Sequence, residues 1–303
     1  MFQGIYKLLY LIYVKLRLYN FKSLRIFKNL SKTFIYSFIK VDESFKINME
    51  EKTDQRHKLL YPKEITNLES KFLEGFKNLY ENESCIIIGN GPSLNFADLS
   101  KIDVPTFAVN SFFIKSQETG FYPTFYTLED KHVVADNIED IKNYNVENKF
   151  IPSLYRELLG NIKNNYYYYL DLSFYQNKPI QFSDNISKSI FAGQTVTYVN
   201  MQLAYYMGFK TVYLIGMDFN YIKPEGTLVN GNTWTSQGDD PNHFSKDYFG
   251  KGKKYHDPQL HKVQIAYEKA KEFYESNGRK IINLTHGGKL EVFPRDSFEN
   301  NFK

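Results

Sequence analysis

One short run constrains the fold of this chain more than any other. Residues 84–94 read Ser-Cys-Ile-Ile-Ile-Gly-Asn-Gly-Pro-Ser-Leu, a pattern typical of a buried strand that ends in a glycine-rich turn. Gly89 and Gly91 tolerate positive φ and let the backbone approach a ligand, and Ser93 can cap a short helix whose free N–H groups favour a phosphate. The turn has neither the Gly-Lys-Ser/Thr of a P-loop nor the third glycine of a dinucleotide fingerprint. It predicts a nucleotide site of another kind, with a plain tight turn as the alternative.

The rest of the chain alternates between apolar runs and helical patterns. The expected strands are 106–109, 124–127, 149–151, 166–170, 211–215 and 280–282, and the expected helices are 70–80, 131–142, 195–207 and 259–276. This alternation predicts an α/β domain over residues 81–303, with a mostly parallel sheet covered on both faces. Residues 223–255 are polar, rich in glycine and aperiodic, which predicts a mobile lid.

The beginning of the chain has a different character. Residues 1–40 hold eight Lys and Arg and no acid, although the whole chain carries only +4, so the remainder is net negative. The charges interrupt the apolar stretch too often for a transmembrane span of ~20 residues, and a signal-peptide cleavage site is missing. We expect residues 1–80 to be a basic amphipathic helical extension that lies on an anionic membrane surface, or a pair of helices packed on the main domain. Without a basic stripe on the body, nucleic acid is not an expected partner.

The chain has a single cysteine, Cys85, inside the first expected strand. One thiol excludes a disulfide framework and favours a reducing compartment. Its place before an apolar run predicts an inert core thiol. Together with the basic beginning, this predicts a cytoplasmic protein held peripherally on the inner face of the cell membrane.

Polar residues follow several of the expected strands. They are Asn90 and Ser93, Asn110 and Ser111, Asp130, Asp218 and Phe219 within Gly-Met-Asp-Phe, and the run 283–288. In parallel sheets, ligands bind outside the carboxyl ends of the strands. Any one of these sets could be ordinary turn chemistry, but sets that converge on one edge of a sheet predict a pocket for a nucleotide or a nucleotide sugar.

The chain resembles the bacterial sialyltransferases of glycosyltransferase family 42 in three segments: Ile-Gly-Asn-Gly-Pro-Ser-Leu at 88–94, Val-Asn-Ser at 109–111, and Gly-Phe-Lys-Thr-Val-Tyr-Leu-Ile-Gly-Met-Asp-Phe at 208–219. Residues 243–258 and 283–295 look closer to the related MptE-like domain, which includes flagellin-glycosylation proteins and an archaeal 6-hydroxymethylpterin pyrophosphokinase. The similarity covers about residues 83–295, and residues 1–80 match neither pattern.

The resemblance implies a single Rossmann-like domain with a lid, which uses a CMP-activated sialic acid without a metal. Carried over by position, the residues that would line the phosphate, the cytidine or the donor are Asn90, Gly91, Ser93, Asn110, Thr195 and Asp218. Tyr221 is the nearest match to the tyrosines that hold the leaving phosphate, and no second tyrosine follows it in residues 222–231. Gly193 stands where the sialyltransferases have an arginine.

Transfer from a CMP sugar needs a base for the acceptor hydroxyl and hydrogen-bond donors for the departing phosphate. Histidine suits the first task because its ordinary pKa is ~6.5, and tyrosine hydroxyls or helix N–H groups suit the second without a metal. His261 falls inside a helical pattern, which leaves His243 and His256 as candidates. The family's base lies just before the penultimate helix, where His256 stands, so His256 is the expected base and His243 the alternative.

The sequence therefore predicts a glycosyltransferase that moves a sialic-acid-like sugar from a CMP donor to a surface glycan or glycolipid, with no cofactor and no metal. One alternative is a nucleotide pyrophosphokinase, whose Mg²⁺ would need carboxylates such as Asp130 and Asp218, assisted by residues 239–240. No lysine follows the glycine-rich turn to pair with a triphosphate, which counts against ATP. A second alternative is a non-catalytic scaffold on the membrane, although Asn110 and His256, which such a scaffold could lose, are both present.

Overall fold

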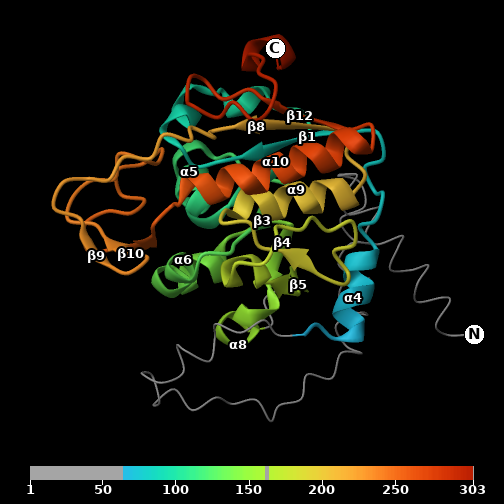
Figure 1. Ribbon diagram of the computed structural model, residues 1–303, viewed down its shortest axis with the longest axis horizontal. Helices are drawn as coiled ribbons and strands as arrows, with labels where there is room; N and C mark the ends of the chain where they lie inside the picture. Colours follow the sequence, from blue (N-terminus) through green and yellow to red (C-terminus); the bar gives the residue numbers. More distant parts are fainter. Residues whose placement is uncertain (1–63, 161–163, 303) are drawn as a thin grey trace, which may run out of the picture. The chain divides into compact units, whose positions relative to one another are not determined.

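The computed structural model describes residues 64–160 and 164–302. The main strands are β1 (Ser84–Ile88), β2 (Thr106–Val109), β3 (Phe125–Thr127), β4 (Asn148–Pro152), β5 (Asn165–Tyr168), β8 (Thr211–Ile215) and β12 (Lys280–Asn283). They form one sheet in the order β12-β8-β1-β2-β3-β4-β5, and every pairing is parallel (Figure 1). The predicted α/β, Rossmann-like fold is confirmed.

Helices alternate with these strands along the chain. They are α4 (Asn67–Glu74), α5 (Phe113–Thr119), α6 (Lys131–Asp136), α7 (Ile138–Asn143), α8 (Arg156–Leu159), α9 (Val196–Tyr206), α10 (Leu260–Ser276) and α11 (Phe298–Asn301). α9 and α10 lie side by side, and α9 contacts β1, β2 and β3 (Figure 1). The buried residues of α10 are Val263, Ala266, Tyr267, Ala270 and Tyr274, at helical spacing.

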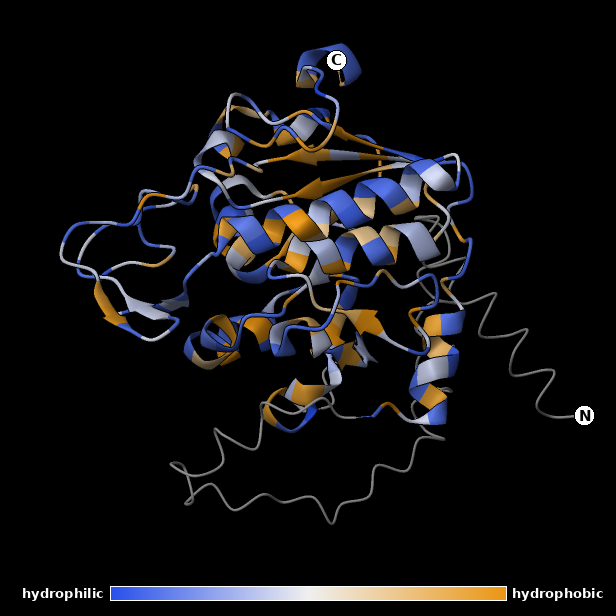
Figure 2. Cartoon of the chain, in the orientation of Figure 1, coloured by the Kyte–Doolittle hydropathy of each residue, from blue (hydrophilic) through white to orange (hydrophobic). Residues whose placement is uncertain are grey.

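Hydrophobicity explains why the strands lie inside. β1 and β2 are buried at almost every position, as expected for strands covered on both faces (Figure 2). The one cysteine, Cys85, is fully buried in β1, and this burial raises the pKa of its thiol well above the ordinary value. A protonated thiol is a poor nucleophile, so the environment matches the inert core thiol that was predicted.

Residues 64–80 pack on the sheet. Thr66 caps α4 and forms a capping box with Glu69, whose carboxylate also pairs with Arg156 at 2.8 Å. After the helix, the Phe76 ring meets the edges of Phe150 and Tyr166 at 5.1 and 4.8 Å between centroids. This part of the expected 1–80 extension thus contacts the α/β domain, while the basic segment 1–40 lies outside the described residues. In the described part of the chain, no helix has the length and apolar character needed to cross a membrane.

The stretch expected to be an unpatterned lid has structure of its own. β9 (Leu228–Asn230), β10 (Thr233–Thr235) and β11 (Lys254–His256) form a small antiparallel sheet in the order β11-β10-β9 (Figure 1). Aromatic side chains between β10 and β11, and one within β11, join the core: Phe244, Tyr248, Phe249 and Tyr255. Strands of three residues are too short for alternation to show in the sequence, which is why the pattern gave no sign of them.

Candidate active site

A cavity of about 210 Å³ lies at the carboxyl ends of β1, β2 and β8. The predicted site residues in its lining are Gly89, Asn90, Gly91, Asn110, Thr195, Asp218, Phe219, Tyr221 and His243. Four other predicted residues, Ser93, Ser111, Asp130 and His256, are not among the residues that line it. The topology therefore brings most of the expected set to one edge of the sheet, as parallel strands do.

The two glycines of the turn serve a close crossing of loops. Gly89 N–H donates to the carbonyl of Ile215 at 2.8 Å, and Gly91 N–H donates to that of Gly216 at 2.9 Å. A Cβ at Gly91 would lie 1.9 Å from an Asp218 carboxylate oxygen, and one at Gly89 would lie 2.5 Å from the Gly216 carbonyl. The sequence predicted that a ligand would approach these two glycines closely. In the structure, the loop after β8 makes this close approach instead.

The prediction that Ser93 caps a helix is wrong. Ser93 lies inside a 3₁₀ turn, Pro92–Phe96, which begins after Gly91. Its hydroxyl donates to Asp218 at 2.6 Å, and its backbone N–H donates to the same carboxylate at 3.2 Å. The carboxylate therefore occupies the donors that were expected to hold a phosphate, and its negative charge would repel one there.

Asn90 joins the turn to the cavity wall. Its side-chain amide donates to the carbonyl of Val109 at 3.0 Å and to the Tyr248 hydroxyl at 2.8 Å. Its Oδ1 is buried and has no hydrogen-bond partner among the described residues. A buried acceptor without a partner costs about 1–3 kcal/mol, so we expect a donor on a ligand to fill this position.

Two helices begin at the cavity. Residues 194–197 at the start of α9 and Pro258 and Leu260 at the start of α10 belong to its lining. Helix N-termini carry unpaired N–H groups and the positive end of the dipole, which attract an anion. No lysine or arginine occurs among the described lining residues. Such a site suits a phosphate of low charge better than a triphosphate.

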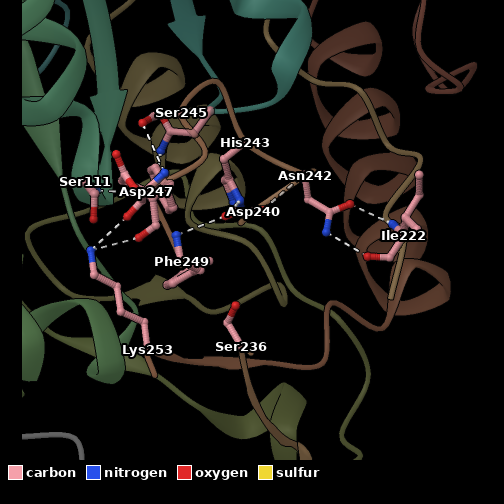
Figure 3. A network of polar contacts seen from close by, with 12 residues as sticks. Ser111, Ile222, Ser236, Asp240, Asn242, His243, Ser245, Asp247, Phe249 and Lys253 are labelled. Atoms are coloured by element: carbon pink, nitrogen blue, oxygen red, sulfur yellow. Dashed lines mark hydrogen bonds and ion pairs between the residues drawn. The ribbon is translucent and has the colours of Figure 1, made fainter. Parts of the chain in front are cut away.

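His243 is the histidine of the cavity wall. Its Nδ1 lies 2.7 Å from Oδ2 of the buried Asp240, which also accepts the N–H of Phe249 at 3.0 Å (Figure 3). The imidazole stacks on the Tyr248 ring, with centroids 4.0 Å apart and planes 1° apart. Because an ionised carboxylate only accepts, Nδ1 carries the hydrogen and Nε2 remains free to take a proton.

Two tyrosines complete this wall. The Tyr221 ring lies 5.8 Å from that of His243, and burial is the main cause that raises the pKa of Tyr221 well above its ordinary value. Tyr248 accepts hydrogen bonds from Asn90 and from the N–H of Ser111 at 3.3 Å, and burial raises the pKa of its hydroxyl too. Both hydroxyls therefore stay protonated and can donate to a ligand.

The structure places His256 elsewhere. It ends β11, and its ring lies 4.5 Å from that of His132 in α6. Asp130 caps α6 through the N–H of His132 at 2.7 Å. The position just before α10 thus does not bring His256 into the cavity lining, whereas His243, the alternative in the sequence, is there.

Sequence reasoning missed part of this site. Asp240 was considered only as one of two lid carboxylates that could assist a metal, and Tyr248 was not considered at all. The spacing Asp-x-x-His at 240–243 was the available signal, because residues three apart meet in a tight turn. Gln194 and Tyr267 also line the cavity without having been expected.

The fold and the cavity define an α/β protein whose ligand site lies at the carboxyl end of a parallel sheet. The chain belongs to the family described as 6-hydroxymethylpterin diphosphokinase MptE-like, which matches residues 59–224. The MptE-like membership predicted from the sequence is thereby confirmed. A comparison with curated proteins found no match.

Two solved structures are similar to this chain. One is the sialyltransferase CstII from Campylobacter jejuni in complex with a substrate analogue, cytidine-5'-monophosphate, with 16% identity, coverage of 70% of this chain and 84% of that chain, and a TM-score of 0.35. The other is the monofunctional alpha-2,3-sialyltransferase Cst-I from Campylobacter jejuni, with 16% identity, coverage of 73% and 83%, and a TM-score of 0.44.

Proposed function

We propose that this protein is a glycosyltransferase that moves a sialic-acid-like sugar from a CMP-activated donor to a hydroxyl group of a surface glycan or glycolipid. One observation carries the proposal: His243, held by the buried Asp240, stands in the wall of a strand-end cavity. The identity of the donor follows from the resemblance of residues 88–94, 109–111 and 208–219 to sialyltransferase segments. The helix N-termini at the cavity, with no lysine or arginine among the described lining residues, favour a single phosphate over a triphosphate.

The chain supplies a general base for the acceptor and hydrogen-bond donors for the leaving group. Nε2 of His243 takes the proton of the acceptor hydroxyl, and the hydroxyl oxygen bonds to the anomeric carbon of the donor. The bond between that carbon and the phosphate oxygen breaks, and CMP leaves with the electron pair. The N–H groups at the start of α9 and the Tyr221 hydroxyl stabilise the charge on the phosphate. Asp240 stabilises the imidazolium that forms, and this transfer uses neither a cofactor nor a metal.

The family's description raises a second function, a Mg²⁺-dependent diphosphokinase. Asp218 is the one carboxylate among the described lining residues, and Ser93 already donates to both of its oxygens. The described residues contain no group of three or more His, Cys, Asp or Glu that could hold a metal ion. Mg²⁺ on a nucleoside triphosphate is held by one or two carboxylates together with the phosphates, and Ser93 already engages the one lining carboxylate, so the residues present do not fit it well. We derive no step through the metal.

Calorimetry distinguishes the two functions. We expect CMP to bind, with an affinity that EDTA does not change, and ATP to bind weakly or not at all. Asn90→Asp replaces an amide of the cavity with a charged carboxylate and should weaken CMP binding at least tenfold. The matched variant Asn277→Asp, at the far end of α10, should bind CMP as the wild type does. Tight ATP binding that EDTA abolishes, without CMP binding, would contradict the proposal.

We also propose that residues 1–40, which lie outside the described residues, bring the enzyme to anionic lipid near its acceptor. Each basic residue near such a surface contributes ~1 kcal/mol of attraction. Co-sedimentation with vesicles of phosphatidylserine and phosphatidylcholine should pellet the full chain but not a chain that begins at Asp54. Equal pelleting of the two would show that residues 1–53 do not bind the membrane.

A further inference from the structure

Beyond the cavity, buried polar atoms gather at the carboxyl ends of β3 and β5. Four of them have no hydrogen-bond partner among the described residues: Thr127 Oγ1, Glu129 Oε2, His132 Nε2 and the Tyr168 hydroxyl. Each such atom costs about 1–3 kcal/mol if it stays without a partner. Native structures contain few of them, so a concentration on one edge of the sheet needs an explanation.

Glu129 is the centre of this patch. Its backbone is held on both sides, because its N–H donates to Asn110 Oδ1 at 3.4 Å and its carbonyl accepts from the Tyr155 hydroxyl at 2.5 Å. The Tyr175 hydroxyl donates to Oε1 at 3.0 Å, which leaves Oε2 as the free oxygen. Burial raises the pKa of Glu129 to about 7, against the effect of the Tyr175 hydrogen bond. Near neutral pH this carboxyl can therefore either accept or donate a hydrogen bond.

The second part of the patch is the pair His132 and His256. Their rings lie 4.5 Å apart and are tilted by 43°. Burial, and then the neighbouring His256, lower the pKa of His132 to about 4, so this imidazole is neutral at physiological pH. A neutral imidazole offers one donor and one acceptor. It suits an uncharged hydroxyl group and gives no charge to attract a phosphate.

The patch adjoins the part of the cavity that holds His243. Asn110 lines the cavity and also accepts the N–H of Glu129. The Asp130 carboxylate, next in the chain, contributes to the raised pKa of both Tyr221 and Tyr248, after burial as the main cause. Asn110 therefore joins the patch to the cavity that His243 lines.

We propose that Glu129, His132 and His256 form the acceptor subsite, which binds the hydroxyl groups of a sugar ring. The proposal rests on the transferase function proposed above. A phosphate would meet the carboxylates of Glu129 and Asp130, and an apolar ligand would leave the four polar atoms without partners. A sugar ring supplies donors and acceptors on both faces and satisfies them.

Tyr175 holds one oxygen of Glu129 and leaves the other oxygen for the ligand. The free oxygen of Glu129 is shielded from solvent, while Tyr175 is 42% exposed and bonds the other oxygen. A sugar hydroxyl donates to the free Oε2, while Tyr175 keeps its hydrogen bond to Oε1.

Saturation-transfer NMR on the full chain tests the subsite. The probes are methyl β-D-galactopyranoside, methyl α-D-glucopyranoside and 6-hydroxymethylpterin at millimolar concentration, and calorimetry with CMP runs in parallel. We expect the wild type and the exposed control Glu139→Leu to bind a pyranoside. Glu129→Leu and His256→Ala should each weaken this binding at least fivefold and leave the CMP affinity unchanged, which also shows that the cavity is folded.

The outcomes separate the two proposals. If CMP binds but no pyranoside does, or if both variants bind pyranosides as the wild type does, the subsite is wrong and the donor site stands. If pyranosides bind and the two variants lose them while CMP fails to bind, the subsite stands and the CMP donor is wrong. Binding of 6-hydroxymethylpterin that depends on Glu129, without pyranoside binding, would overturn the sugar assignment.

Discussion

The segment 223–257 supplies two histidines with different surroundings. We call the surroundings of His243 the first corner and those of His256 the second corner, and the two differ in the group that contacts the imidazole. His243 meets a buried carboxylate, Asp240, at 2.7 Å and lies flat on Tyr248. His256 meets another imidazole, that of His132, with ring centroids 4.5 Å apart. A carboxylate stabilises a protonated imidazole, whereas a second imidazole does not. The partner thus decides which histidine can carry a proton during a reaction.

The carboxyl groups of the two corners also differ in how completely they are bonded. Both oxygens of Asp240 accept hydrogen bonds, from Asn242 at 2.8 Å and from Phe249 at 3.0 Å (Figure 3). In the second corner, the Nε2 of His132, whose ring contacts that of His256, and the Oε2 of Glu129 are buried without a partner among the described residues. The bonded carboxylate of Asp240 can hold His243 in place, and the free oxygen of Glu129 can accept a hydrogen bond from a ligand. This contrast supports the proposed roles of the first corner in proton transfer and of the second in substrate binding.

The largest expected effect tests the first assignment. His243→Ala should lower the turnover of sugar transfer by about 10²–10⁴-fold, because it removes the general base. The affinity for CMP, measured by calorimetry, should stay nearly unchanged, since the loss lies in the transition state. His261→Ala on α10 is the matched control and should keep full turnover. If His256→Ala lowers turnover more than His243→Ala does, the roles of the two corners are reversed.

A smaller effect is expected when the carboxylate of this corner is neutralised. Asp240→Asn keeps the shape of the side chain but no longer stabilises the imidazolium of His243, and it can hold the ring in the wrong tautomer. Turnover should fall by about 10–10²-fold, and the pH dependence of kcat/KM should shift with it. The exposed neighbour Asp239→Asn serves as the control. An unchanged pH profile in Asp240→Asn would show that the carboxylate only supports the loop.

The fold was open to prediction because its signals are local. Apolar runs marked β1 and β8, and the helical period marked α9 and α10, so those elements were expected almost where they lie. The general position of the site followed from the same pattern, since the ends of parallel strands meet at one edge.

The chemistry of the site depends on contacts between distant parts of the chain. Ser93 looked like a helix cap until Asp218, 125 residues later, is seen to take its donors. Asn90 and Tyr248, 158 residues apart, fix the wall beside His243. Glu129 resembled any acidic residue in a turn, because its burial comes from tyrosines on other elements, among them Tyr155 and Tyr175. No window of sequence contains these pairs.

The second corner can be tested through stability. Glu129 has a pKa of about 7 in the folded protein, above the ordinary value of 4.5, so its protonated form is the favoured one there. Its contribution to the free energy of unfolding is fully present below pH 4.5 and is lost as the pH rises through 7. The wild type should therefore lose about 2–3 kcal/mol relative to Glu129→Gln between pH 5 and pH 8.

Urea unfolding of both proteins at several pH values measures this difference. The effect of His132 cancels, because both proteins contain it and only residue 129 differs. Parallel stability profiles for the wild type and Glu129→Gln would show that this carboxyl is ionised at pH 7 in the folded state, and the patch would then lose its neutral character.

The smallest expected effect concerns the imidazole pair itself. His132→Ala and His256→Ala should each raise the KM for the acceptor by about 3–10-fold, equivalent to the loss of one or two hydrogen bonds to a neutral hydroxyl, with kcat nearly unchanged. Because the rings contact each other, the double variant should be little worse than either single one, which is the mark of a pair that acts as a unit. The KM for the donor is the internal control and should not move. A fall in kcat with an unchanged acceptor KM would instead give the pair a part in proton transfer and would erase the distinction between the two corners.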